Sequence, residues 1–428
     1  MAQAVDDAVT VVESATTTTP LARNDRLSNL TGAEVWLKRE DAQPVRSYKL
    51  RGAYTLMSQL DEEQGRRGVV CASAGNHAQG VAWSCARLGV TGQIFVPTTT
   101  PRQKKDRIRE IGRDQVELIV TGETYDAASD AAKAEAARSG RVLVPAFDDP
   151  RTIAGQGTVA AEIVAQLGHA PDTMILPVGG GGLLSGCAAW LSVHAPGCRV
   201  IGVEPTGAAC VIAGLKASRP VSLPEVDTFV DGTAVRRAGD VTLGLIERLG
   251  FQVADQAAGG ASRVVMTIPE GQVCTEMLAM YQTDGIIAEP AGALASAALR
   301  RGPHDSIISI VPGETVVAVV SGGNNDISRY NEVLERSLIH EGRKHYFMVS
   351  FPQEPGQLRR FLDRILGPND DIVLFEYVKK SNREAGPALV GIELGDPNDI
   401  GALMSRAAAS PIRVEPIPAD STFFRYLV

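Results

Sequence analysis

Apolar positions along the chain form short β-branched runs that alternate with longer segments carrying one apolar face. The runs that predict strands are EVWLKRE (34–40), GVVCA (68–72), TGQIFVP (91–97), QVELIV (115–120), RVLVPAF (141–147), TMILPV (173–178), CRVIGVEP (198–205) and ETVVAVVS (314–321). The segments between them predict helices, including TVAAEIVAQLG at 158–168. Strands that alternate with helices assemble into parallel sheets, so the pattern predicts a two-lobed parallel-sheet α/β domain over residues 19–326.

The last part of the chain follows a different order of elements. Its predicted strands are HYFMVSF (345–351), DIVLFEYVKK (371–380), GPALVGIEL (386–394) and IRVEPI (412–417), with helices after the first and the third. This βαββαβ order is the ferredoxin-like arrangement, which we assign to residues 344–428. Nothing in it looks catalytic, so we expect a regulatory module. We expect a connector at 327–343 and a flexible tail at 1–18.

Composition and charge narrow the class of protein. The chain has 428 residues and a formal net charge of −8, without a long basic block, which argues against partners such as nucleic acid or an anionic membrane. Six cysteines are scattered without CxxC spacing, as in reduced thiols of a cytoplasmic enzyme. No segment reads as a signal peptide or a membrane span. We therefore expect a cytoplasmic globular enzyme.

The stretch PVRSYKLRGAY (44–54) places Lys49 where a helix begins. A lysine held away from bulk water loses its proton more readily and becomes a nucleophile toward aldehydes. The alternative is a surface lysine at a helix start, with an ordinary pKa of about 10.4. This stretch alone leaves both interpretations open.

The run GGGGL (179–183) follows a predicted strand and precedes a predicted helix. Four glycines allow backbone N–H groups to converge on an anion, and the helix start adds positive potential, which together suit a phosphate. A structural glycine turn is the alternative. The run has neither the Lys-Ser/Thr of a P-loop nor the GxGxxG spacing, so a nucleotide is the weaker choice of phosphate ligand.

The segment SAGNHAQG (73–80) lies at the same kind of strand-to-helix junction. Ser73, Asn76 and the local N–H groups are suited to a carboxylate, and Asn76 is also suited to a phenolic oxygen. His77 has no neighbouring carboxylate in the sequence. We therefore favour a positioning role for His77 over acid–base catalysis.

Two further segments carry weaker signals. SGGNN (321–325) follows a buried strand directly, so Ser321 should lie at a carboxyl end, where open α/β sheets bind ligands. In EPAGA (289–293), Glu289 could be no more than a helix-start carboxylate favoured by the helix dipole. Each segment alone could be an ordinary turn.

Taken together, these parts are those needed to hold pyridoxal phosphate: a lysine, a phosphate cup, an amide and a hydroxyl. The chain resembles the β-family (fold type II) pyridoxal-phosphate enzymes, and among them the threonine dehydratases. The resemblance covers about residues 19–326 and rests on SYKLRGA, SAGNHAQG, GGGGL, VEP, EPAGA and SGGN in this order.

The resemblance implies a role for each matching residue. Lys49 would bond to the cofactor and act as the catalytic base. The cofactor would also be bound by Asn76 at its 3′-oxygen, by Ser321 at its ring nitrogen, and at its phosphate by Gly179, Gly180, Gly181, Gly182 and Leu183. The substrate carboxylate would be bound by Ser73, Ala74, Gly75, Asn76 and His77.

The implied reaction is β-elimination from L-threonine, possible also for L-serine, to give 2-oxobutanoate and ammonia from threonine in the first step of isoleucine biosynthesis. Related serine racemases carry a serine at the position of Ala74, so this residue argues for dehydration. Some relatives bind a metal between the glutamate matching Glu204 and a carboxylate six residues on. That second position is Cys210, so we expect no required metal.

The terminal module resembles the single ACT-like regulatory domain of short biosynthetic threonine dehydratases, most clearly at FPQEPGQLRRFL (351–362). This likeness implies feedback inhibition by isoleucine, with valine as another candidate effector. An effector site would need a partner subunit's module, and the family suggests a homotetramer or a homodimer.

Three alternatives stay open from the sequence. Another β-family enzyme, such as a serine dehydratase, a racemase or a threonine synthase, would share the cofactor cup. A non-enzymatic amino-acid sensor would not need Lys49. A nucleotide-binding oxidoreductase would explain the glycine run but would leave SYKLRGA unexplained.

Overall fold

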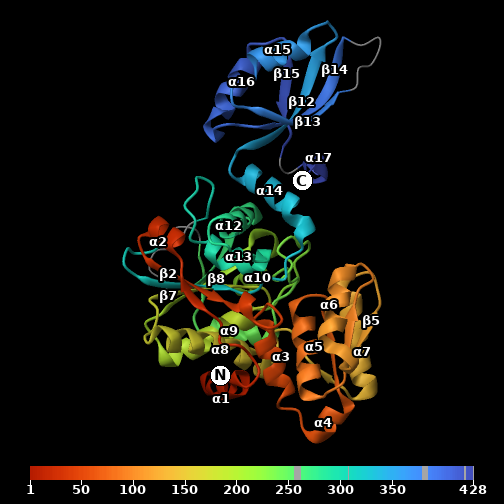
Figure 1. The fold of residues 1–428 in the computed structure, drawn as a ribbon, viewed down its shortest axis with the longest axis vertical. Coiled ribbons are helices and arrows are strands. Elements are labelled where there is room, and N and C mark those ends of the chain that lie inside the picture. The colour runs from red at the N-terminus through yellow and green to blue at the C-terminus, as the bar shows by residue number, and fades with distance from the viewer. Residues whose placement is uncertain (255–261, 307, 378–383, 419–420, 428) are drawn as a thin grey trace. The chain divides into compact units, whose positions relative to one another are not determined.

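The computed structural model describes residues 1–254, 262–306, 308–377, 384–418 and 421–427 (Figure 1). The chain forms two compact units. The larger unit consists of Met1–Arg301 and Asp305–Asp326, and the smaller unit of Gly302–His304 and Ile327–Val428.

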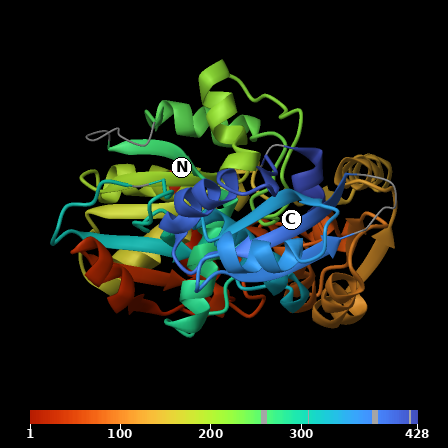
Figure 2. The same cartoon turned by 90° about the horizontal axis from the view of Figure 1, so that it is seen from above.

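A seven-stranded sheet forms the centre of the larger unit, and Figure 2 shows its strands side by side. In spatial order the strands are β1 (Leu21–Arg23), β2 (Glu34–Arg39), β11 (Thr315–Val320), β7 (Thr173–Pro177), β8 (Arg199–Pro205), β10 (Arg263–Ile268) and β9 (Gln252–Val253). Only the edge strand β1 is antiparallel to its neighbour. The carboxyl ends of the parallel strands therefore meet at one edge, where α/β sheets bind ligands.

A second sheet, entirely parallel, forms a smaller lobe of the same unit. Its strands are β5 (Val116–Val120), β4 (Gly92–Val96), β3 (Val69–Ala72) and β6 (Val142–Leu143). Its helices are α4 (Glu62–Arg67), α5 (Asn76–Leu88), α6 (Arg102–Gly112) and α7 (Tyr125–Ser139). Val69 and Cys71 pack with α5 and α6, whereas Val70 packs with α7, because successive strand residues face opposite sides. The predicted two-lobed α/β fold is confirmed.

The remaining helices of the larger unit pack around the seven-stranded sheet. They are α1 (Ala2–Glu13), α2 (Asp25–Thr31), α3 (Lys49–Met57), α8 (Pro150–Leu167), α9 (Gly182–His194), α10 (Cys210–Ala217), α11 (Asp240–Arg248), α12 (Glu270–Gln282) and α13 (Pro290–Ala297). Helix α8 begins at Pro150, about two turns before the predicted start at Thr158. Its first turn is set by the Asp149 side chain, which accepts from Arg151 N, and by proline at the first helical position.

The expectation of a flexible tail at 1–18 is wrong. Residues Ala2–Glu13 form α1, whose Val5, Ala8 and Val12 are buried, and Val5 and Ala8 lie in one core cluster with residues of α8 and α9. Asp6 Oδ1 accepts a hydrogen bond from Trp190 Nε1 of α9 at 2.7 Å. These three buried residues recur three and four positions apart, so they lie on one face of the helix. This spacing is the helical period of 3.6 residues, although the segment that carries it is short.

The smaller unit has the predicted ferredoxin-like topology. Its antiparallel sheet has the order β13 (Asp371–Tyr377), β14 (Ala385–Glu393), β12 (Lys344–Pro352) and β15 (Arg413–Pro416). Its helices are α14 (Tyr330–His340), α15 (Gln357–Arg364), α16 (Ile400–Ala408) and α17 (Thr422–Leu427). The core of this unit is its own, with Phe347, Phe361 and Leu403 at the centre. Positions 378–380 of the predicted strand DIVLFEYVKK lie outside the described residues.

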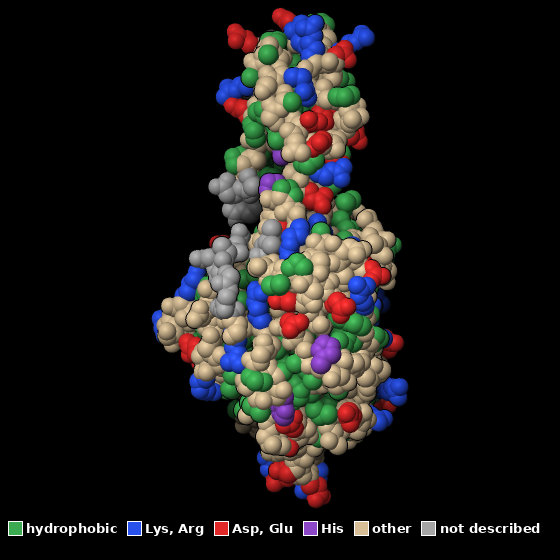
Figure 3. Space-filling model, turned by 90° about the vertical axis from the view of Figure 1, so that its left-hand side faces the viewer, with side chains coloured by type: hydrophobic (Ala, Val, Ile, Leu, Met, Phe, Trp, Pro, Cys, Tyr) green, Lys and Arg blue, Asp and Glu red, His purple; other side chains and the backbone are tan. Residues whose placement is uncertain are grey.

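The surface of the larger unit carries charges of both signs. Figure 3 shows Lys and Arg interspersed with Asp and Glu over its visible face. Among the described residues, none of the helices combines the length and the apolar content that crossing a membrane requires.

Replacing Val5 with alanine should destabilise the larger unit, because the side chain is fully buried between α1 and its neighbours. We expect a loss of about 2 kcal/mol, since two buried carbon atoms are removed and a cavity remains. The measurement is the midpoint of thermal unfolding. Val193→Ala makes the same chemical change at a side chain that is 63% exposed and serves as the control. Equal midpoints for the two variants would contradict the packing of α1.

Candidate active site

Lys49 is the first residue of α3 and lies beside the end of β11. Tyr48 N donates to the carbonyl of Ser321 at 3.2 Å, which fixes the chain just before the lysine. Lys49 Nζ donates to the carbonyl of Ala146 at 2.9 Å. Burial lowers the pKa of the Lys49 amine to about 8, although the charge of Glu289 opposes this change. An appreciable fraction of the amine is therefore uncharged near neutral pH, unlike that of a surface lysine.

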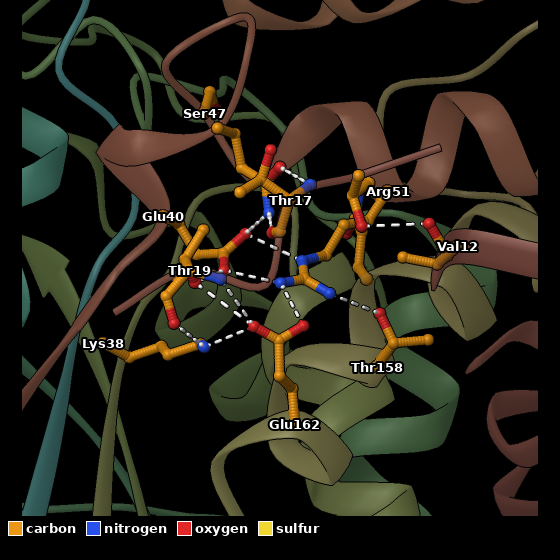
Figure 4. A network of polar contacts seen from close by, with 12 residues as sticks. Val12, Thr17, Thr19, Lys38, Glu40, Ser47, Arg51, Thr158 and Glu162 are labelled. Atoms are coloured by element: carbon orange, nitrogen blue, oxygen red, sulfur yellow. Dashed lines mark hydrogen bonds and ion pairs between the residues drawn. The ribbon is translucent and has the colours of Figure 1, made fainter. Parts of the chain in front are cut away.

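A network of buried ion pairs anchors α3 immediately after Lys49 (Figure 4). Arg51 points between two carboxylates and makes two hydrogen bonds with Glu40, at 2.8 and 2.7 Å. It also donates to Glu162 at 2.8 Å, and Lys38 binds the other oxygen of Glu162. Paired charges of this kind have defined geometry, so the network fixes the rotation of α3 about its axis.

The glycine run forms the turn between β7 and α9. Gly181 has a φ of +95°, a conformation that side chains other than glycine rarely adopt. A Cβ built on Gly180 would lie 2.4 Å from the ring of Phe147, so the backbone and this ring are in direct contact. The run Gly179–Leu183 lines one pocket together with Tyr48, Lys49 and Phe147. The structure thus brings the glycine run and the lysine together, as the sequence predicted.

Asn76 begins α5 in the smaller lobe, and both ends of its amide are bonded. Its Nδ2 donates to Glu289 Oε1 at 2.6 Å, and its Oδ1 accepts from Asn324 Nδ2 at 2.8 Å. Burial raises the pKa of Glu289 to about 8, and the charge of Asp231 adds to this effect. Glu289 is therefore more than a helix-start carboxylate, since it orients the predicted cofactor-binding amide.

Ser321 lies at the carboxyl end of β11, as expected, and it is buried. Its hydroxyl donates to the carbonyl of Ala291 at 3.1 Å. A backbone bridge between Ser47 and Gly322 ties this strand end to the segment that carries Lys49. The predicted ring-nitrogen partner therefore lies next to the predicted catalytic lysine.

The segment Ser73–His77 comprises the turn after β3 and the first two residues of α5. Gly75 N donates to Ser73 Oγ at 3.3 Å, and Ser73, Ala74, Gly75 and Asn76 are partly exposed. His77 is buried and its Nε2 donates to the carbonyl of Val144 at 2.8 Å. Burial and the charge of Lys49 lower the pKa of His77 to about 4, so its ring is neutral at pH 7. These properties suit a positioning role better than proton transfer.

Glu204, which matches a metal-binding glutamate of some relatives, is the next-to-last residue of β8 and contacts the start of α10. Its two carboxylate oxygens accept from Val211 N and Ile212 N at 2.8 and 2.9 Å. Burial raises its pKa to about 8, although these hydrogen bonds oppose the change. The Cys210 thiol donates to the carbonyl of Gly179 at 3.5 Å. Across the described ranges no three His, Cys, Asp or Glu side chains are grouped to hold a metal.

The short segment Val144–Phe147, which directly follows β6, contributes to the site although no role was predicted for it. Its carbonyls accept from His77, from Thr152 and from both Lys49 and Gln156. A usable signal was present, because RVLVPAF was predicted to be a strand of a parallel sheet and the carboxyl ends of such strands line binding sites.

These residues fit pyridoxal phosphate. The aldehyde of this cofactor requires an uncharged amine, which burial provides at Lys49. Its phosphate requires converging N–H groups and close backbone approach, which the side-chain-free turn before α9 provides.

Comparison with protein families agrees with this fit. A family model described as "Pyridoxal-phosphate dependent enzyme" matches residues 12–322, and one described as "C-terminal regulatory domain of Threonine dehydratase" matches residues 335–427. The expected cofactor and the expected regulatory character of the smaller unit are therefore confirmed.

Individual proteins give a more specific likeness. The chain is 54% identical to the biosynthetic L-threonine dehydratase of Mycobacterium tuberculosis (strain ATCC 25618 / H37Rv) over 424 residues, which cover 99% of this chain and 95% of that protein. It is 48% identical to the Bacillus subtilis (strain 168) enzyme of the same name, over 96% of this chain and 93% of that protein.

The fold is similar to that of the processed threonine deaminase isoform 2 of Solanum lycopersicum. The TM-score is 0.70 at 35% identity, covering 78% of this chain and 92% of that one. The chain therefore belongs to the pyridoxal-phosphate-dependent enzyme family and, within it, to the biosynthetic threonine dehydratases.

Proposed function

We propose that this protein is an L-threonine dehydratase that converts L-threonine to 2-oxobutanoate and ammonia, the first step of isoleucine biosynthesis. The observation that carries the proposal is the buried, partly neutral amine of Lys49 in one pocket with the glycine turn Gly179–Gly182. The names of the relatives from two bacterial species support the choice of substrate.

Pyridoxal phosphate, when bound, withdraws electrons from the substrate and so stabilises negative charge at Cα. Lys49 would hold the cofactor and, once displaced by the substrate amine, would take the Cα proton with its neutral Nζ. The carbonyl of Ala146 supports this step, because it can accept a hydrogen bond from Lys49 Nζ and so keep the amine inside the pocket. Neutral His77 would add no competing acid at pH 7.

The other site residues would bind and orient. The N–H groups of Gly179, Gly180, Gly181, Gly182 and Leu183 would bind the phosphate. Asn76, held by Glu289 and Asn324, would contact the 3′-oxygen, and Ser321 would be the neutral partner of the ring nitrogen. The loop of Ser73, Ala74, Gly75, Asn76 and His77 would receive the substrate carboxylate. Ala74 offers no hydroxyl for proton transfer on the opposite face, which supports elimination over racemisation.

The purified protein with pyridoxal phosphate should release 2-oxo acid from L-threonine, and L-serine in the same assay measures the competing preference. Lys49→Ala should lose activity by at least about 10³-fold, because both the attachment point and the base are removed. Lys133→Ala, at an exposed lysine of α7, is the matched control and should keep full activity. Absence of 2-oxo acid from both substrates would refute the proposed function.

Gly180→Ala should weaken cofactor binding at least about tenfold, since the new methyl group would overlap the Phe147 ring and displace the glycine turn Gly179–Gly182. Titration of the cofactor-free protein with pyridoxal phosphate measures this affinity. Gly197→Ala is the control, because a Cβ there meets no atom within 4 Å. Unchanged affinity in Gly180→Ala would show that this turn does not bind the cofactor.

For the smaller unit we propose allosteric inhibition by isoleucine, with valine as the competing effector. The independent core of this unit supports a binding module that is separate from the chemistry. We propose a homotetramer or homodimer, in which two such modules together form the effector site. A cytoplasmic location is also proposed, and the six free, buried cysteines support a reducing compartment.

Truncation after Arg343 should leave a dehydratase that no longer responds to isoleucine, because the binding module is removed while the cores of the larger unit remain. Initial rates with and without isoleucine or valine, for the full and the truncated chain, measure the effect. Inhibition of the truncated enzyme to the same extent would place the effector site elsewhere.

A further inference from the structure

Helix α8 touches both helices that build the active site, through two glycines on either side of Gln156. A Cβ on Gly155 would lie 2.5 Å from the carbonyl oxygen of Arg51 in α3. A Cβ on Gly157 would lie 2.9 Å from the carbonyl oxygen of Gly186 in α9. The three helices therefore approach at backbone distance, and Gln156 is placed between the start of α3 and the start of α9.

The side chain of Gln156 is fully buried and reaches the lysine's own hydrogen-bond acceptor. Gln156 Nε2 donates to the carbonyl of Ala146 at 3.0 Å, and Lys49 Nζ donates to the same oxygen at 2.9 Å. The stem of Gln156 packs against α3, since a Cβ on Gly52 would lie 3.0 Å from its Cγ. One carbonyl oxygen is thus shared by a permanent amide donor and by the reactive amine.

The oxygen of the Gln156 amide faces the glycine turn Gly179–Gly182. A Cβ on Gly182, the residue at which α9 begins, would lie 2.3 Å from Gln156 Oε1. This buried oxygen has no hydrogen-bond partner within the part of the chain that the structure describes. A buried unpaired acceptor is unfavourable, so space filling alone does not explain an amide at this position.

We propose that Gln156 is a positioning residue for Lys49: it holds the Ala146 carbonyl in place and hydrogen-bonded while the lysine amine leaves that oxygen for the cofactor and returns to it. The proposal rests on the proposed role of Lys49. Without Gln156, the departure of Nζ would leave a buried carbonyl unpaired, which would favour the cofactor-free arrangement of the lysine.

Two substitutions of Gln156 test its hydrogen-bond donor and its lack of charge separately. Gln156→Met keeps the volume and removes the donor, so we expect at least about fivefold slower cofactor capture. Gln156→Glu keeps the shape but adds a charge beside Lys49 and the phosphate turn. We expect at least about tenfold weaker cofactor binding and a higher pH midpoint for capture, because a carboxylate favours the protonated amine. Gln272→Met is the matched control, since Gln272 is also fully buried and bonds the backbone carbonyls of Ala297 and Ser306.

The measurement is the rate at which visible cofactor absorbance appears after pyridoxal phosphate is mixed with cofactor-free protein, as a function of pH. Thermal unfolding of each variant separates loss of folding from loss of positioning. If Gln156→Glu does not fold, the capture rate of Gln156→Met alone tests the proposal. Capture rates and pH midpoints equal to those of the parent and of Gln272→Met would overturn the proposal. Since no threonine is used, failure of the dehydratase assay is a distinguishable result.

Discussion

The close approach of α8 to both α3 and α9 is the constraint on which the active site depends. At Gly155 and Gly157, carbonyl groups of the two neighbouring helices occupy the space that a side chain of α8 would need. A larger residue at either point would separate the start of α3 from the start of α9. Lys49 and the glycine turn Gly179–Gly182 lie in one pocket because α8 allows these two helix starts to lie close together, and the ion pairs of Arg51 then fix the orientation of α3.

Burial also sets the charges of the site. It lowers the pKa of Lys49 to about 8 and that of His77 to about 4, and it raises the pKa of Glu289 to about 8. All three changes favour the neutral form, because a low-dielectric site penalises charge of either sign. A pocket of this kind can receive an anionic phosphate and an anionic substrate with little opposing charge from Glu289, while its lysine stays available as a nucleophile and a base.

Much of this architecture was predictable from the sequence, and the failures have physical causes. Parallel strands could be predicted because their short β-branched runs are almost wholly apolar. Asn76 and Ser321 could be proposed as site residues because each closely follows such a run, whereas Lys49 stands where a helix begins. Helix α1 was missed because its buried face consists of only Val5, Ala8 and Val12, and other apolar residues on the same short segment blur the helical period. Gln156 was missed because its role depends on the carbonyl of Ala146, and a backbone group that every residue carries leaves no mark in a sequence.

The composition of the pocket explains why the phosphate turn consists of backbone alone. Among the described residues that line the pocket, Lys49 is the only one with a cationic side chain, and the proposed function assigns it to the aldehyde of the cofactor. A second lysine or arginine beside it would lower the pKa of Lys49 further, yet it would also pair with the carboxylate of the substrate and compete with the loop Ser73–His77. Backbone N–H groups avoid this conflict, since they attract the phosphate at short range and contribute no full charge. In the proposed function, a glycine turn and a neutral lysine therefore serve the same chemistry.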